Sequence, residues 1–265
     1  MILRVEDDFD LDRIAESGQC FRWQRLETGG YRIPHGRRCL RIRPAGEGRF
    51  DLDCGGDALD GTWRAYFDLD ESYRAIRARI DPDDACLLRA AEAGRGIHIL
   101  RQDPWETLVT FLISQNRNIP SIRRSVLRLA ELGGGDPFGA FPAPEDVLRM
   151  GEEGLRACSL GYRTRYVLDA ARQVSSGRLD LAALTGADGG AAEAALRGVC
   201  GVGEKVAACV ALFGLHQLNA FPVDVWITRV LREHYPDGFP FARYAPYCGV
   251  YQQYLFAWRR EEAGR

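Results

Sequence analysis

The sequence predicts an α+β protein in which a small N-terminal antiparallel β-sheet packs on a larger, mostly α-helical body. Over residues 1–80, short runs rich in aromatic and β-branched residues are separated by Gly, Pro and Asp at the spacing of β-hairpins. Over residues 81–265, apolar residues recur instead with the period of an α-helix. A glycine-rich turn joins two helical segments at about residues 190–215. We therefore expect a sheet domain at 1–80 and a helical domain at 81–265.

The N-terminal runs predict roughly five strands, about one for each turn signal. The clearest of these runs are GQCFRWQRL, GGYRIPHG, RRCLRIRP and GRFDLD. Past Leu59 the pattern becomes helical, and the segments after Asp83 are about two to four turns long, with Gly, Pro or Asp at their ends. Within the glycine-rich region, one helix is predicted to end near Arg197 and the next to begin near Glu204.

Charge and cysteine content narrow the classes of protein. A net charge of −2 means that any nucleic-acid binding requires positive charge gathered on one face. The 8 cysteines are scattered without a CxxC pair, which argues against a zinc site or an iron–sulfur cluster. The acidic N-terminus does not resemble a signal peptide, and no apolar run approaches the ~18 residues of a membrane span. We expect a cytoplasmic, monomeric protein with reduced thiols.

The chain contains a single lysine, Lys205, among its 35 lysine and arginine residues. Arginine stays protonated in proteins, whereas lysine can lose its proton and become an amine nucleophile. Lys205 is therefore a candidate for chemistry that a guanidinium group does not perform. The alternative is chance survival of one lysine at a solvated position in a chain with a strong bias toward arginine.

The turn before Lys205 contains Gly201 and Gly203, which allow positive φ and bring bare backbone to the surface. The helix that follows presents free N–H groups at its N-terminus, and such groups bind phosphate. This pattern resembles a helix-hairpin-helix, which clamps the DNA backbone without reading its sequence. The alternative is a tight turn between two packed helices.

Downstream of the hairpin, Asp224 precedes a helical run and is a good N-cap residue. A carboxylate at a helix N-terminus is stabilised as the anion. An ionised aspartate beside a deprotonated lysine is also a catalytic pair: the amine attacks the anomeric carbon of a sugar, and the carboxylate stabilises the developing positive charge. Asp224 can therefore serve both roles.

Further stretches follow, in order, the pattern of one known family: GQCFRW (18–23), LRQDPWETLVTFLISQNRNI (100–119), LGYRTRYV (160–167) and GVYQQYLF (249–256). With the hairpin, Lys205 and Asp224, they resemble the 8-oxoguanine DNA glycosylase/AP lyase family of the helix-hairpin-helix (HhH-GPD) superfamily. The matches span nearly the whole chain. Lys205 and Asp224 match the catalytic lysine and aspartate of that family.

The resemblance also implies roles in recognition of the base. Gly18 matches the glycine whose carbonyl accepts the N7–H of 8-oxoguanine, a proton that guanine lacks. Cys209 and Phe256 match the two sides of a sandwich around the flipped base, and Cys209 lies one turn after Lys205 on the same helix face. Gln252 matches a residue that hydrogen-bonds the Watson–Crick edge.

Other matches concern the DNA duplex. Asn116 matches the residue that fills the gap left by the extruded nucleotide, and Tyr162 and Arg163 match a wedge and a contact to the orphaned cytosine. Three positions depart from the family pattern: Ser121 replaces an arginine that reads the opposite base, Trp226 replaces a common histidine, and Cys200 replaces the usual proline of the hairpin. Arg123 and Arg124 are candidates to substitute for the missing arginine.

The family resemblance implies a bifunctional DNA N-glycosylase and lyase that acts on double-stranded DNA containing oxidised guanine. It implies no required cofactor, and a structural monovalent or calcium cation held by the backbone carbonyls of Arg197, Val199 and Val202. The alternatives are a helix-hairpin-helix glycosylase with another oxidised-base target, and a non-catalytic DNA-binding module. The first is disfavoured by the missing four-cysteine cluster of the oxidised-pyrimidine enzymes, and the second by the Lys205–Asp224 pair.

Overall fold

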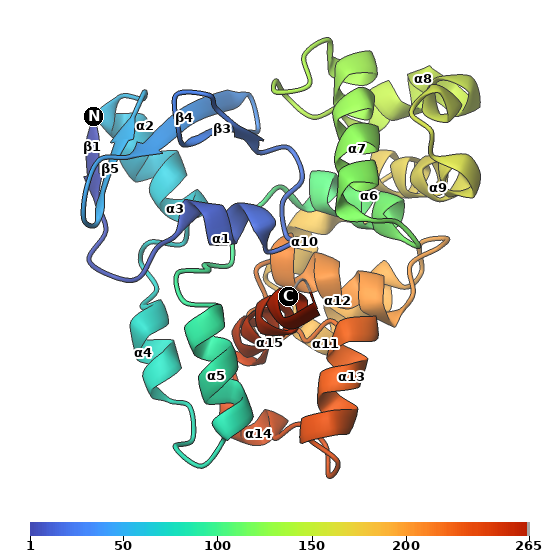
Figure 1. The fold of residues 1–265 in the computed structure, drawn as a ribbon. Helices are drawn as coiled ribbons and strands as arrows, with labels where there is room; N and C mark the ends of the chain where they lie inside the picture. The colour runs from blue at the N-terminus through green and yellow to red at the C-terminus, as the bar shows by residue number, and fades with distance from the viewer. Residues whose placement is uncertain (264–265) are drawn as a thin grey trace.

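The computed structural model describes residues 1–263, except for the side chain of Asp60. An antiparallel sheet in the order β1-β5-β4-β3-β2 forms the N-terminal lobe (Figure 1). Tyr31 pairs with Ile42 and Ile33 with Leu40, so their buried side chains share one face of the sheet. The predicted antiparallel sheet is confirmed. Its strands are β1 (Ile2–Arg4), β2 (Gln24–Arg25), β3 (Tyr31–His35), β4 (Arg38–Pro44) and β5 (Arg49–Leu52).

One part of the N-terminal prediction was wrong. Residues 18–23 form no strand, and α1 (Leu11–Glu16) is a helix inside the region that the sequence assigned to strands. The carboxylate of Asp10 caps this helix by accepting the backbone N–H groups of Asp12 and Arg13. Figure 1 shows α1 between the sheet and the helical body. The segment 18–23 thus becomes a buried connection between the two lobes.

The helical body wraps around α12 and α15 in the centre of Figure 1. Rings from α6 and α12 stack there, with the centroids of Phe111 and Phe213 5.5 Å apart. The described helices are α2 (Gly56–Ala58), a π-helical turn (Leu59–Trp63), α3 (Arg64–Tyr66), α4 (Tyr73–Ala78), α5 (Ala85–Ala93), α6 (Pro104–Ser114), α7 (Ile119–Gly134), α8 (Pro144–Ala157), a 3₁₀ turn (Gly161–Arg163), α9 (Thr164–Ser175), α10 (Leu181–Thr185), α11 (Gly189–Leu196), α12 (Glu204–Phe213), α13 (Val225–His234), α14 (Phe241–Tyr244) and α15 (Cys248–Ala263).

Each lobe has its own hydrophobic core. The sheet core contains Trp23, Ile33 and Leu40, whereas Tyr73 and Ile76 already belong to the helical core. The boundary at residue 80 stays a prediction. Within residues 1–263, no helix combines the length and the apolar character needed to cross a membrane.

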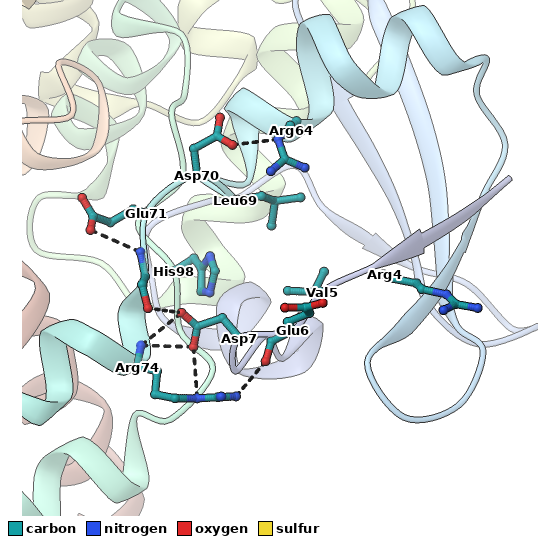
Figure 2. A pocket seen from close by; sticks show the side chains of 11 residues that line it. Arg4, Val5, Glu6, Asp7, Arg64, Leu69, Asp70, Glu71, Arg74 and His98 are labelled. Carbon is teal, nitrogen blue, oxygen red and sulfur yellow. Dashed lines mark hydrogen bonds and ion pairs between the residues drawn. The ribbon is translucent and has the colours of Figure 1, made fainter.

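A cavity of about 500 Å³ opens where the first strand meets the segment between α3 and α4 (Figure 2). Several of its polar groups bond one another: the side chain of Arg64 bonds Asp70 at 2.7 Å, and the backbone N–H of Arg74 bonds the carboxylate of Asp7 at 3.0 Å. None of the lining residues belongs to α12, α13 or α15. This cavity is a junction between lobes, apart from the helices that carry Lys205 and Asp224.

Arg22 ties the two lobes together through a buried ion pair. Its side chain is only 1% exposed, and Nε and Nη2 donate to the two carboxylate oxygens of Glu106 at 2.7 and 2.6 Å. Its Nη1 donates to the carbonyls of Pro137 and Gly139. Because the charge is paired and the guanidinium makes four hydrogen bonds, its burial is tolerated.

We expect Arg22→Met to destabilise the protein by about 3–5 kcal/mol, because the Glu106 charge loses its buried partner. Urea unfolding followed by circular dichroism measures the loss. Arg156→Met is the matched control, since it removes an exposed i,i+4 pair with Glu152 and should leave the midpoint nearly unchanged. Equal midpoints for the two variants would contradict the assigned role of Arg22.

Candidate active site

The predicted helical hairpin is confirmed, with α11 ending at Leu196 and α12 beginning at Glu204. Gly201 adopts φ +85°, and a Cβ there would lie 2.4 Å from the ring of Tyr166 on α9. Only glycine therefore fits this turn. Gly203 is the N-cap of α12 and supplies no side-chain cap. The first N–H groups of α12 are thus left for an outside acceptor.

Lys205 lies in the first turn of α12 and is half-buried, with Nζ 5.2 Å from the ring centroid of Phe111. One turn later, Cys209 is 3% exposed. Burial raises the pKa of the Cys209 thiol to about 11, while a hydrogen bond and the charge of Lys205 lower it and Asp224 raises it. The thiol therefore stays protonated at neutral pH. The Cys209 thiol lies close enough to both Lys205 and Asp224 to interact electrostatically with them.

Asp224 caps α13, as predicted. Its Oδ1 accepts the backbone N–H groups of Trp226 at 3.0 Å and Ile227 at 2.8 Å. The other oxygen, Oδ2, accepts no hydrogen bond from residues 1–263. The cap thus holds the carboxylate in place and leaves its second oxygen without a partner among the described residues.

Gly18 brings the sheet lobe to α15. It adopts φ +80°, and a Cβ there would lie 3.4 Å from the ring of Phe256. On α15, Gln252 is buried, and its Nε2 donates to the carbonyl of Pro222 at 2.9 Å. Gly18, Gln252 and Phe256, far apart in the sequence, are thereby brought to one part of α15.

Family profiles match almost the whole chain. Residues 1–108 match the N-terminal domain of 8-oxoguanine DNA glycosylase, and residues 109–238 match the HhH-GPD superfamily of base excision DNA repair proteins. The solved structure of MBOgg1 with a low-affinity DNA ligand is 35% identical, with a TM-score of 0.91 over 99% of this chain and 96% of that one. The chain belongs to the 8-oxoguanine DNA glycosylase family.

Other relatives agree with this assignment. The 8-oxoguanine glycosylase/lyase of Clostridium acetobutylicum, solved with double-stranded DNA containing cytosine opposite 8-oxoG, is 29% identical. Its TM-score is 0.89 over 99% of this chain and 98% of that one. The N-glycosylase/DNA lyase of Saccharomyces cerevisiae is 32% identical over 69% of this chain. The chain spans 54% of the length of the yeast protein.

The loop between α6 and α7 carries Asn116, the predicted gap-filling residue, and places it against Tyr162, the predicted wedge. Asn116 adopts φ +52°, and its Nδ2 donates to the hydroxyl of Tyr162 at 3.0 Å. Tyr162 is 47% exposed. Arg163 is 6% exposed and donates to the carbonyls of Gln115 and Leu160. Its guanidinium therefore supports the Asn116 loop in this structure, and its contact with an orphaned cytosine stays a prediction.

Unpaired positive charge surrounds this wedge. Among residues 1–263, no carboxylate pairs with Arg117, Arg124, Arg163 or Arg165. Burial and the charges of Arg163 and Arg124 lower the pKa of Arg117. Arg117 thus lies near two other cations, although the net charge of the chain is −2.

The structure distinguishes between the arginines that could take the place of the one missing at Ser121. Arg123 donates to the carbonyl of Ala15 and to the carboxylate of Glu16, and is thereby bound to α1. Ser121 itself lies in the first turn of α7, where its N–H is bound by Asn118. Among the described residues, Arg124 is exposed and has no partner, and Arg117 bonds only the neutral groups of Ser125 and Ser159. Arg117 was not among the candidates predicted from the sequence, although its place between two asparagines of the loop was an available signal.

Proposed function

We propose that this protein flips 8-oxoguanine out of duplex DNA, cleaves its N-glycosidic bond through a Schiff base at Lys205 and nicks the strand by β-elimination. One observation carries the proposal. The only lysine of the chain is half-buried at the start of α12, beside a protonated thiol and near the carboxylate of Asp224. An amine and an ionised carboxylate are the two groups that this chemistry needs.

The reaction divides between these two groups. The deprotonated Nζ of Lys205 forms a bond to C1′ as the bond from C1′ to N9 breaks, and the base leaves with the bonding electrons and takes up a proton. Asp224 stabilises the positive charge that develops on the sugar. Ring opening gives the Schiff base, and loss of a C2′ proton then expels the 3′ phosphate. These steps require no redox cofactor.

Recognition of the base is assigned to the contact between Gly18 and α15. The carbonyl of Gly18 accepts the N7–H that distinguishes 8-oxoguanine from guanine, whose N7 would face that carbonyl as a second acceptor. Cys209 and Phe256 enclose the two faces of the base, and Gln252 bonds its Watson–Crick edge. The approach of Gly18 to Phe256 supports this assignment.

We expect Gly18→Ala to slow excision of 8-oxoguanine while nicking of a preformed abasic site continues. The new methyl group occupies the space beside the Phe256 ring, 3.4 Å from it, and the positive φ adds about 1–2 kcal/mol of backbone strain. Gly36→Ala is the matched control, because Gly36 also has positive φ and its Cβ would meet nothing within 4 Å. Equal loss of excision in the two variants would show that strain alone is responsible.

Double-stranded DNA containing oxidised guanine is the proposed partner, bound by a single copy of the chain and therefore found with chromosomal DNA in the cytoplasm. The N–H groups at Gly201 and Gly203 bind the phosphate backbone. Asn116 and Tyr162 fill the gap left by the flipped base. The exposure of Tyr162 and the unpaired arginines around it support this orientation.

The unpaired arginines lead us to expect that the affinity for DNA depends on salt concentration. Arg117→Gln should weaken binding to undamaged duplex and reduce the slope of log K against log salt concentration by about 1, because one phosphate contact is lost. Fluorescence anisotropy at several salt concentrations measures the slope. Arg156→Gln, on α8 and paired with Glu152, should leave it unchanged. An unchanged slope for Arg117→Gln would remove this residue from the DNA-binding face.

A structural monovalent or calcium cation at the hairpin remains part of the proposal. The carbonyls of Arg197, Val199 and Val202 lie in the turn that precedes α12. The Val199 oxygen already accepts the N–H of Val202 at 3.0 Å and keeps a second lone pair for a hard cation. Such a cation would add positive charge at the place where the phosphate backbone binds.

The substrate is tested with duplexes that hold one 8-oxoguanine opposite each of the four bases, and with a duplex that holds thymine glycol. We expect base release and strand cleavage on 8-oxoguanine and none on thymine glycol. The inverse result would assign the chain to oxidised pyrimidines. Binding without cleavage of any duplex would make it a DNA-binding module.

A further inference from the structure

A second glutamine lies beside Gln252 on α15, and neither the catalytic chemistry nor the base sandwich uses it. Gln253 is 3% exposed, and its Nε2 donates to Oε1 of Gln252 at 3.0 Å. Positions 249, 252, 253 and 256 have the i, i+3, i+4, i+7 spacing of one helix face. Gln253 thus shares the face of α15 that carries Gln252 and Phe256.

The orientation of the Gln252 amide follows from its partners. The carbonyl of Pro222 can only accept, so the group that faces it at 2.9 Å must be Nε2 of Gln252. The opposite end of the amide is then Oε1, which receives the Nε2–H of Gln253. Pro222 and Gln253 therefore hold the two ends of one amide. One N–H and one lone pair of Gln252 remain unused by the protein.

The unused N–H and the unused lone pair of the Gln252 amide match the Watson–Crick edge of guanine. That edge presents the acceptor O6 next to the donor N1–H. Adenine presents the reverse order, a donor amino group next to the acceptor N1. For an adenine-type base the amide would have to turn over, which would place Oε1 against the carbonyl of Pro222. The held orientation therefore favours guanine-type bases.

We propose that Gln253 is a positioning residue for base recognition, which fixes the carbonyl end of Gln252 while Pro222 sets its orientation. This inference rests on the proposed function and adds to it the residue that orients Gln252 toward the Watson–Crick edge. Without Gln253 the amide is held only at its nitrogen and swings about that bond. Both contacts to the base then lose their alignment.

The unused oxygen of Gln253 supports a role beyond packing. Its Oε1 is buried and accepts no hydrogen bond from residues 1–263. Methionine would fill a similar volume without burying an unsatisfied acceptor. Within the described part of the chain, the one hydrogen bond that the side chain of Gln253 makes is the bond to Gln252.

The test compares two lesions that share N7–H and the C8 oxygen but differ at the Watson–Crick edge, 8-oxoguanine and 8-oxoadenine, each opposite cytosine. Single-turnover excision is measured for the native protein and for Gln253→Met. We expect the ratio of the two rates to fall about tenfold in the variant, because 8-oxoguanine loses an aligned buried hydrogen bond that 8-oxoadenine never makes. Nicking of a preformed abasic site and the melting temperature should stay unchanged.

A double-mutant cycle separates positioning from direct contact. In a Gln252→Met background, Gln253→Met should not change the ratio further, because Gln253 acts through Gln252. Equal slowing on both lesions, or an unchanged ratio, would overturn the role of Gln253. If Gln253→Met unfolds, Gln253→Leu takes its place. A native protein that excises neither lesion and does not nick the abasic site refutes the proposed function itself, which is a different outcome.

Discussion

Lys205→Gln should lower the single-turnover rate of 8-oxoguanine excision and strand nicking by at least about 10³-fold, because the attacking amine is lost. Duplex binding should be nearly retained, since the hairpin backbone and the wedge are untouched. The rate is measured on a duplex with one 8-oxoguanine opposite cytosine, and affinity by anisotropy on the same duplex. Lys205 sits in the first turn of α12, and the buried residues of that helix are 206–213, so the fold should be preserved.

Lys205→Arg is the control that separates charge from nucleophilicity. Arginine is the cation that this chain uses at every other basic position, and it keeps the positive charge beside Cys209. A guanidinium group does not form the Schiff base. We therefore expect Lys205→Arg to be as inactive as Lys205→Gln. Substantial activity in Lys205→Arg would mean that Lys205 supplies charge, and the covalent mechanism would be wrong.

Asp224→Asn should reduce the excision rate by about 10²- to 10³-fold, because an amide does not stabilise the positive charge on the sugar as a carboxylate does. Asparagine is as good an N-cap as aspartate, so α13 should keep its start and the melting temperature should change little. Excision and thermal unfolding are measured on the same preparation.

Asp224→Ala provides the comparison that separates the two roles of the residue. It removes both the charge and the cap, which accepts the N–H groups of Trp226 and Ile227. We expect an additional loss of stability of about 1 kcal/mol relative to Asp224→Asn, with similar excision rates for the two variants. An active Asp224→Asn would reduce Asp224 to a structural cap.

The features predicted most closely from sequence are those fixed by neighbouring residues. The end of α11 near Arg197 and the start of α12 at Glu204 follow from the glycines between them, and the cap at Asp224 follows from its place before an amphipathic run. Each depends on local backbone chemistry, which short stretches of sequence specify.

Short elements, in which helix and strand patterns compete, were harder to predict from the sequence. α1 has only 6 residues, although Asp10 before Leu11, Ile14 and Ala15 is a helix-start pattern. The aromatic residues of 18–23 suggested a strand, but their partners come from distant segments. Trp23 bonds Tyr66, and Arg22 bonds Glu106. Tertiary contacts therefore determined that segment, and no window of the sequence contains them.

The direction in which a side chain points was the other feature that could not be predicted from the sequence. The prediction for Arg163 assigned a contact with DNA, whereas the structure directs its guanidinium to two carbonyls of the chain. Gln253 was not predicted because glutamine on a helix is usually solvated, although its spacing from Phe256 indicated the side of α15 that carries the predicted base contacts. Rotamers and partners of this kind depend on the packed neighbours rather than on spacing.

The central claim is that the amine of Lys205 bonds covalently to the sugar. Borohydride reduction during reaction with an 8-oxoguanine duplex, followed by proteolysis and mass spectrometry, tests it directly. Lys205 is the single lysine of the sequence, so no other side chain in it supplies a primary amine. We expect a reduced sugar adduct on the peptide that contains Lys205. An adduct on any other peptide, or excision without an adduct, would contradict the covalent mechanism.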